Sequence, residues 1–383
     1  RSTLSVAAPT LRNEFSMSTE DYSWVVLAFQ ASYTVMQTLA GTVLDVLGTR
    51  LGFFLFAIGW ALANMAHAMA SGWQSLAAFR ALLGASEAAA IPAGAKTVSQ
   101  WFPARERPLA TSLFQMGTSV GNMIAPPLVA FCILAWNWRA AFIVTGALSL
   151  GWAMLWWWGY RDPAEHPALT DEERARIVQG QTDASVAAKP ATRKDVLASR
   201  SFWAIAVPRF LSEPAWQTFN FFIPLYLVAV WKLDLKSIAL WAWLPFLAAD
   251  FGSLAAGLLP PWLMRRGSTL LSSRKVTMTL GALCMVGPAC IGLATSPAMA
   301  IALFCIGGFA HQMLNGALIT LCADLFDSKT VGTASGMAGT SAWIGGMLFT
   351  LLIAATIFAN FVNFTSMPGE LKDWITHLGL SPT

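Results

Sequence analysis

The chain has 383 residues, of which 56% are hydrophobic and 11% are charged, and its mean hydropathy is +0.56. This composition is too apolar for an ordinary soluble domain and indicates a helical protein that crosses a membrane several times. The net charge of +4 is small, and the basic residues stand in short clusters between apolar runs, so nucleic-acid binding is not expected.

Ten stretches of about 20 apolar residues are each long enough to cross a bilayer as a helix. They cover residues 22–44, 52–70, 73–98, 109–135, 139–160, 203–230, 238–263, 276–294, 297–323 and 332–357. Residues 1–9 resemble the exit end of a further helix, because apolar residues run directly into Pro9 and a polar turn. The chain is therefore expected to begin inside its first helix.

A charged, alanine-rich segment, residues 161–200, separates the sixth predicted helix from the seventh. Thr170 followed by Glu173 is typical of a capping box, so part of this segment is expected to form a helix at the membrane surface. The predicted organisation is an N-terminal helix bundle over 1–160, a linker over 161–200, a C-terminal bundle over 201–357 and an atypical tail over 358–383.

Basic residues concentrate in the linker and in the loops on the same predicted side of the membrane. They are Arg50, Arg105, Arg107, Arg193, Lys194, Arg200, Arg265, Arg266, Arg274, Lys275 and Lys329. The opposite loops hold fewer basic residues, and acidic residues partly offset them. The positive-inside rule therefore places the N-terminus and the linker in the cytoplasm, as in a multi-pass protein of a bacterial inner membrane.

Two ionisable residues, Arg80 and Glu87, lie inside the otherwise uncharged apolar stretch from Trp73 to Ala95. A charge at membrane depth costs about 2.5 to 3.5 kcal/mol even on a lenient scale, so it persists mainly where it faces protein or a polar cavity. Seven residues advance a helix by nearly two turns, which leaves the side chains about 20° apart in azimuth and about 10 Å apart in height. We expect both to face one functional space; a static ion pair between helices is the alternative.

The cysteines and histidines form no metal-binding or disulfide pattern. The five cysteines lack C-x-x-C spacing, and the four histidines are scattered without a His/Cys cluster. We therefore predict no metal site, no disulfide framework and no cofactor. Among the histidines, only His311 lies deep inside an apolar span.

The loop after the second span carries a motif of glycines and charges at Gly41, Asp45, Gly48 and Arg50. It resembles the cytoplasmic signature G-x-x-x-D-R-x-G-x-R of the major facilitator superfamily, although Val46 replaces the usual first basic residue. Asp45 and Arg50 can pair with each other or cap helix ends, and the glycines permit close helix approach. A cytoplasmic gate is predicted here, whereas an ordinary positive-inside loop would explain the arginines alone.

Two halves of six helices, joined by a linker, also fit this superfamily. The predicted fold is an all-α polytopic membrane protein with two six-helix bundles in parallel repeat, an incomplete first helix and no normal twelfth helix. Residues 257–267 repeat part of the gate motif in the second half, which supports duplication.

Longer segments resemble the anion:cation symporter branch of the superfamily, which includes bacterial hexuronate and galactonate proton symporters. The resemblance covers residues 1 to about 345. It is carried by RSTLSVAAPTL, RALLGASEAAAIPAGAKTVSQWFPARER, GTSVGNMIAPPL, PFLAADFGSLAAG and ADLFDSKTVGTASGMAGT. In this branch one arginine in the first helix and one in the fourth bind the substrate carboxylate, while acidic residues there exchange the coupling proton. The resemblance implies Arg1 and Arg80 as carboxylate ligands and Glu87 as the proton-coupling acid.

Other embedded polar residues suit the hydroxyl groups of a sugar acid. The candidates are Gln115, Asn122, Trp216, Asn220, Tyr226, His311, Gln312 and Asn315. For each of them, hydrogen bonding between helices is the alternative. Asp250, in the eighth span, is either a second protonation site or a cap on a broken backbone turn.

These patterns predict import of a sugar-acid anion, such as galacturonate, glucuronate or galactonate, by proton symport through alternating access. The expected partners are the small organic anion, a proton and the lipid bilayer, with no nucleic acid, and the chain is expected to be a monomer. No nucleophile, metal cluster or phosphate loop supports an enzyme. The alternatives are a carrier for another small organic anion, such as tartrate or a phthalate, a truncated chain that does not transport, and a non-transporting sensor.

The tail after Trp343-Ile-Gly-Gly departs from this family. It resembles part of the large membrane subunit of tripartite ATP-independent periplasmic transporters. Residues 345–348 would then mark the junction of a fusion or of a sequence-assembly error, and divergence of the last helices is the alternative.

Overall fold

The computed structural model describes residues 2–185, 192–232, 241 and 243–364. Arg1 and the tail from residue 365 onward, both subjects of predictions, lie outside the described residues. Within the described residues the regular structure is entirely helical. The predicted all-helical class is therefore confirmed.

The N-terminal half contains seven α-helices. They are α1 (Ser2–Glu14), α2 (Thr19–Leu47), α3 (Thr49–Ala66) continued by η1 (His67–Met69), α4 (Trp73–Glu87), α5 (Ala90–Trp101), α6 (Arg107–Ala135) and α7 (Trp138–Gly159). The linker forms α8 (Asp171–Ser185) and α9 (Arg193–Ala198).

The C-terminal half continues with long helices. They are α10 (Arg200–Trp231), α12 (Leu244–Arg265), α13 (Leu270–Cys284), α14 (Val286–Ala289) with η2 (Ile291–Leu293), α15 (Pro297–Leu325) and α16 (Val331–Phe364). Each of the ten predicted spans thus contains helix. Among the described residues, six helical segments are both long and apolar enough to cross a membrane.

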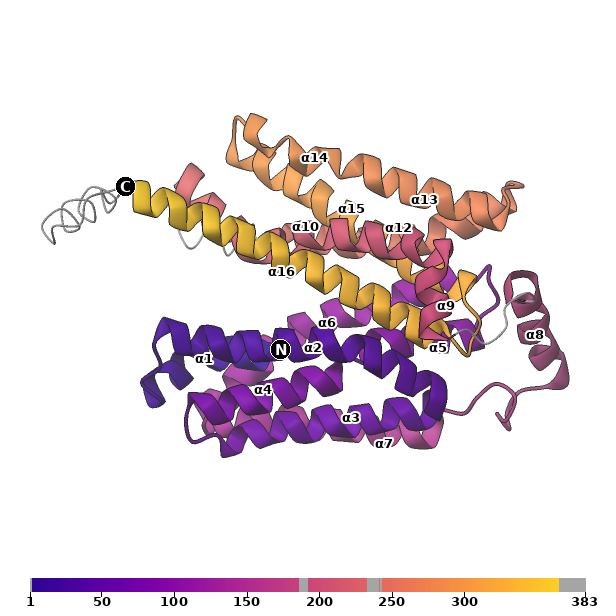
Figure 1. The fold of residues 1–383 in the computed structure, drawn as a ribbon, viewed down its shortest axis with the longest axis horizontal. Coiled ribbons are helices and arrows are strands. Elements are labelled where there is room, and N and C mark those ends of the chain that lie inside the picture. Colours follow the sequence, from indigo (N-terminus) through magenta and orange to yellow (C-terminus); the bar gives the residue numbers. More distant parts are fainter. Residues whose placement is uncertain (1, 186–191, 233–240, 242, 365–383) are drawn as a thin grey trace, which may run out of the picture.

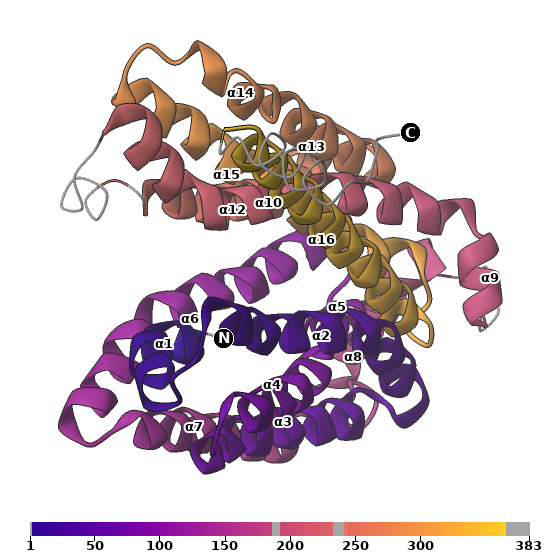
Figure 2. The same ribbon diagram turned by 60° about the vertical axis from the view of Figure 1, so that its left-hand side comes forward.

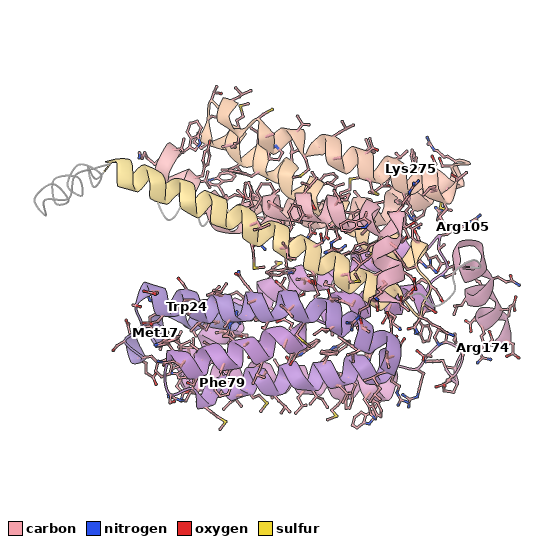
Figure 3. The ribbon with its side chains drawn as sticks, in the orientation of Figure 1. Met17, Trp24, Phe79, Arg105, Arg174 and Lys275 are labelled. Atoms are coloured by element: carbon pink, nitrogen blue, oxygen red, sulfur yellow. The ribbon has the colours of Figure 1, made fainter. Side chains whose placement is uncertain are left out.

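The helices form two bundles that lie side by side (Figures 1 and 2). Helices α1–α7 make one bundle and α10–α16 the other, while α16 packs against both α2 and α10, and α12 packs against both α6 and α15. We call the end of the bundles where α5, α8 and α9 lie the linker end. Arg105, Arg174 and Lys275 lie there, and Met17 lies at the opposite end (Figure 3).

Pro92 explains why the fourth span is interrupted. In a continuous helix the N–H of residue 92 would bond to the carbonyl of Ala88, but proline has no N–H and its ring clashes with that carbonyl. Helix α4 ends at Glu87 and α5 begins at Ala90. The embedded acid predicted from the sequence therefore stands at the end of a helix, directly before the interruption.

The linker helix α8 begins with the predicted capping box. The Thr170 N–H donates to a Glu173 carboxylate oxygen at 3.0 Å, and the Glu173 N–H donates to the Thr170 hydroxyl at 3.2 Å. The backbone bond from Thr170, followed by its side-chain bond, lowers the pKa of Glu173 below its ordinary value. A lowered folded-state pKa means that this cap stabilises the helix above the unfolded pKa and is lost as the pH falls through the folded one.

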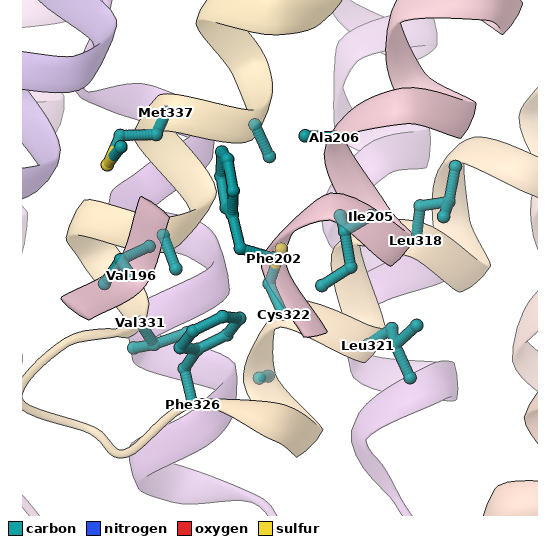
Figure 4. Packing of buried hydrophobic residues seen from close by; sticks show 13 residues of the cluster. Val196, Phe202, Ile205, Ala206, Leu318, Leu321, Cys322, Phe326, Val331 and Met337 are labelled. Carbon is teal, nitrogen blue, oxygen red and sulfur yellow. The ribbon is translucent and has the colours of Figure 1, made fainter. Parts of the chain in front are cut away.

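The largest buried apolar cluster among the described residues joins α9 to the C-terminal bundle (Figure 4). Val196 of α9 packs in this cluster with Phe202 of α10, Phe326 after α15 and Val331 of α16. Each of these side chains is less than 10% exposed and therefore contributes its burial to stability. The second part of the linker is thus anchored to the C-terminal bundle.

We predict that Phe202→Ala destabilises the protein by about 3–5 kcal/mol, because it removes a buried ring and leaves a cavity. Thermal denaturation of the purified protein in detergent should show a clearly lower melting temperature. Leu211→Ala, on the same helix but with a side chain 68% exposed, is the matched control. Equal melting temperatures for the two variants would contradict the packing role of Phe202.

Candidate functional site

Arg80 is buried in the N-terminal bundle, against the ring of Phe29. Its side chain is 6% exposed, and the guanidinium carbon lies 4.2 Å from the centre of the Phe29 ring of α2. An aromatic face stabilises a cation without removing its charge, so the guanidinium retains its attraction for a carboxylate.

A chain of ring contacts connects this group to the other bundle. Phe29 stacks on Tyr33, with ring centres 5.6 Å apart, and Tyr33 lies 5.0 Å from the ring centre of Trp343 on α16. The surroundings of Arg80 therefore include α2 and α4 of one bundle and reach α16 of the other. Phe29, Tyr33 and Trp343 were not predicted from the sequence, because aromatic residues are frequent in every span.

Glu87 shares helix α4 with Arg80, and the helix is continuous between them. Because they are seven residues apart on a continuous helix, both side chains start from the same side of α4, as predicted. Glu87 is half-buried. Gly84, between them, lies so close to α2 that an added Cβ would be 2.4 Å from the Phe29 carbonyl oxygen. Glycine at this position allows α4 and α2 to pack closely beside the candidate site.

Three of the predicted amide residues meet across the bundle interface. Asn315 of α15 donates through Nδ2 to Gln115 Oε1 of α6 at 3.0 Å and to Gln312 Oε1 at 3.3 Å. Gln115 is 7% exposed. For Gln115 and Asn315, the hydrogen bond between helices that was the alternative is therefore present, whereas the Gln312 bond lies within α15. The same amides can rearrange to bind hydroxyl groups, since each carries both donors and an acceptor.

The remaining candidates lie in the C-terminal bundle or on α6. His311 is buried and stacks on Trp216 of α10, with ring centres 5.0 Å apart and planes 13° apart. Tyr226 makes an edge contact with Phe304 at 5.6 Å. Asp250 is half-buried on α12. The side chains of Asn122 and Asn220 lie outside the described residues, although their backbones belong to α6 and α10.

Asp45 makes the first of two buried charged contacts at the linker end. Its Oδ1 accepts a bond from Lys96 Nζ at 2.7 Å, and its two oxygens accept the backbone N–H groups of Gly332 at 3.2 Å and Thr333 at 2.6 Å. The Asp45 and Lys96 side chains are 7% and 3% exposed. Asp45 therefore caps α16 of the opposite bundle, where the helix dipole favours a negative charge.

Arg50 caps a different helix. It donates to the Trp157 carbonyl near the end of α7 through Nη2 at 2.9 Å and Nε at 3.3 Å, and its guanidinium lies 4.3 Å from the Trp157 ring centre. The sequence left open whether Asp45 and Arg50 pair with each other or cap helix ends. In the structure both residues cap helix ends. Lys96, the partner of Asp45, was missed, although a lone lysine directly after an apolar stretch was a usable signal.

Gly41 and Gly48 of the motif are each required by a different structural constraint. A Cβ on Gly41 would lie 2.1 Å from the Gly332 carbonyl oxygen, so α2 and α16 can approach this closely only without a side chain there. Gly48, between α2 and α3, has φ of +79°, a conformation that side chains other than glycine rarely adopt. The two glycines thus fix a contact between bundles and a tight turn.

Asp324, at the end of α15, makes the second buried charged contact. Arg107 of α6 donates to Asp324 Oδ1 at 3.1 Å and to the Ala323 carbonyl at 2.7 Å. Arg274 of α13 donates to Asp324 Oδ2 at 2.8 Å and to the Ala104 carbonyl at 2.7 Å. These three charged side chains are at most 4% exposed. Because they connect both bundles, the linker end is closed in this conformation.

We predict that Asp324→Asn lowers the free energy of unfolding by about 3–5 kcal/mol, because it leaves two buried guanidinium groups facing a neutral amide. The melting temperature of the purified protein measures this effect. Asp327→Asn, three residues further along and half-buried, is the matched control. A variant of Asp324 as stable as the control would show that the buried ion pairs do not hold the linker end together.

Comparison with known proteins agrees with this architecture. A sequence profile described as Major Facilitator Superfamily matches residues 1–361. The chain is 50% identical over 371 residues to the hexuronate transporter of Escherichia coli strain K12, covering 96% of this chain and 85% of that one. It is 48% identical over 305 residues to the galacturonate transporter of Dickeya chrysanthemi, covering 79% of this chain and 88% of that one.

A solved structure confirms the fold. The crystal structure of FucP, a Major Facilitator Superfamily transporter in the outward conformation, superposes with a TM-score of 0.70 at 13% identity. The match covers 94% of this chain and 88% of that one. At this level of identity the likeness concerns the fold alone.

Proposed function

Because this chain belongs to the Major Facilitator Superfamily, we propose that it is a transporter that moves a sugar-acid anion, specifically a hexuronate such as galacturonate or glucuronate, by proton symport. The identity of about half of all aligned residues with a hexuronate transporter supports this substrate class. Because these relatives are transporters, they also argue against an enzymatic function. The observation that carries the proposal is the buried guanidinium of Arg80 on the Phe29 ring, which ring contacts through Tyr33 connect to Trp343 of the other bundle.

Arg80 suits the carboxylate of the substrate. A guanidinium is always charged and can donate two parallel hydrogen bonds to a carboxylate, whereas lysine offers a single point charge. Arg1, which the sequence resemblance implies as the second carboxylate ligand, lies outside the described residues. The substrate would approach Arg80 along the aromatic group formed by Phe29, Tyr33 and Trp343.

The amides at the bundle interface suit the hydroxyl groups. Gln115 comes from α6, and Gln312 and Asn315 come from α15, so a sugar bound between them would contact both bundles. Trp216, which stacks on the buried His311, offers a flat aromatic surface beside it. Asn122, Asn220 and Tyr226 are further proposed contacts. Contact with both bundles allows substrate binding to favour one arrangement of the bundles over another.

Glu87 is the proposed coupling residue, with Asp250 as a second protonation site. In our mechanism the anion and the proton enter from the end opposite the linker. Protonation of Glu87 removes its attraction for the Arg80 cation, which then holds the substrate carboxylate. The contacts of Asp45 and Asp324 at the linker end break as the bundles rock, and the substrate leaves there.

The linker end is proposed to face the cytoplasm of a bacterial cell, because the basic residues of the loops and linker gather on that side. The gate residues Gly41, Asp45, Gly48 and Arg50 would then close the cytoplasmic side. The chain is proposed to act as a monomer. The resemblance of the tail to another transporter class stays a prediction, and the profile of the superfamily extends to residue 361.

Reconstituted protein should take up galacturonate and glucuronate faster when the liposome interior is alkaline relative to the outside. Uptake of labelled galacturonate, glucuronate and galactonate, with and without a pH gradient, measures substrate and coupling together. Arg80→Lys keeps the positive charge but loses the bidentate geometry, so we expect at least a tenfold loss of uptake on the scale of one good charged hydrogen bond. Uptake of none of these sugar acids, or uptake indifferent to Arg80→Lys, would contradict the proposal.

Glu87→Gln should abolish accumulation driven by a pH gradient while leaving exchange of substrate across the membrane, because the amide keeps the shape of the side chain but cannot release a proton. Counterflow in liposomes preloaded with galacturonate measures exchange separately from accumulation. Glu106→Gln, a carboxylate at the linker end that pairs with Arg176 at 2.9 Å, is the control. If Glu87→Gln still concentrates substrate, another group couples the proton.

A further inference from the structure

A shallow groove runs along the contact between α6 and α12 on the outside of the two bundles. Its volume is about 460 Å³. Leu109 of α6 forms one side, and Leu258, Pro261 and Trp262 of α12 form much of the other. Leu258 and Trp262 are 56% and 45% exposed, so an apolar surface is open to whatever surrounds the helices. Because both helices are candidate membrane spans, that surrounding is lipid.

Positive charge lies at one end of the groove. Arg265 lines the groove itself, and the Arg266 guanidinium lies 4.0 Å from the centre of the Trp262 ring. Arg105 and Lys275 lie at the same end of the molecule (Figure 3). The nearby carboxylate of Glu106 is already paired with Arg176. An apolar groove that ends in exposed arginines complements a molecule with acyl chains and an anionic headgroup.

The base of the groove is a contact between the two bundles. The Ser112 hydroxyl of α6 donates to the Ser253 carbonyl of α12 at 2.5 Å. A Cβ on Gly257 would lie 2.6 Å from the Ser112 oxygen and 3.2 Å from the Leu109 Cα. When the linker end opens, α6 and α12 must separate here, and the two sides of the groove separate with them. A molecule that fills the groove therefore binds the closed linker end better than the open one.

We propose that an anionic phospholipid binds this groove, with its phosphate at Arg265 and Arg266 and one acyl chain along Leu258 and Trp262, and that it favours the conformation closed at the linker end. Membrane lipid composition would thereby bias the transport cycle from outside the substrate site. The inference rests on the proposed function only for that consequence, since lipid binding itself requires no transport.

Native mass spectrometry of the purified protein with phosphatidylglycerol or phosphatidylcholine tests the site. We expect phosphatidylglycerol to bind more tightly, and the double variant Arg265→Gln/Arg266→Gln to lose on the order of 10-fold in that affinity. Arg200→Gln/Lys329→Gln removes the same charge from exposed positions outside the groove and should bind like the unmodified protein. Equal binding of the two lipids, or equal loss in both double variants, would reveal only general attraction and overturn the proposal.

The variant Leu258→Trp tests the apolar part of the groove separately from its charged end. The larger side chain fills the apolar space while every arginine remains, so phosphatidylglycerol binding should fall as it does in the arginine variant. A melting temperature close to that of the unmodified protein in detergent without lipid shows that the variant is folded. Unchanged binding by folded Leu258→Trp would overturn the groove as the acyl-chain site. Neither measurement uses substrate, so the test of lipid binding is independent of the uptake experiments that test the proposed function.

Discussion

The closed linker end depends on the contact between the Asp45 carboxylate of α2 and the first backbone N–H groups of α16. The first N–H groups of a helix have no partner within the helix and carry partial positive charge, and Asp45 satisfies two of them at the start of α16. Lys96 neutralises the same carboxylate from α5. This geometry exists only because Gly41 and Gly332 let α2 and α16 approach without side chains between them. Charge, helix end and glycine contact therefore form one unit.

Asp324 also makes a buried contact between the bundles, but its carboxylate binds arginine side chains where Asp45 binds backbone amides. Two guanidinium groups, one from each bundle, meet its carboxylate in a nearly dry setting. Well-packed apolar residues of similar volume are often at least as stable as buried ion pairs. Buried ion pairs differ from apolar contacts in another way. When the bundles separate, water can hydrate each charge, so separation costs less free energy than exposing apolar surface would. Buried charge at this end suits a contact that would form and break repeatedly in the proposed transport cycle.

Much of the fold followed from the sequence, because apolar runs of about 20 residues leave few alternatives in a membrane. The capping box at Thr170 and the functional interest of buried Arg80 were also visible in local patterns. The partners of the charges were not. Arg107 was counted among loop arginines although its side chain is 3% exposed, because only the packing of α6 against α15 shows that it meets Asp324. Local sequence identifies a costly charge, whereas its neutralising partner is set by tertiary contacts.

Part of the proposed substrate site and the Asp45 contact lie on the same two helices, α2 and α16. Phe29, which carries the Arg80 guanidinium, and Asp45 both belong to α2, 16 residues apart, or about 24 Å along the helix. Trp343, at the other end of the ring contacts, and Gly332, at the capped end, both belong to α16. A rigid movement of α16 against α2 therefore changes both places at once. In the proposed transport cycle, coupling between substrate and gate then needs no relay of side chains, because the two places lie at different heights along one helix pair.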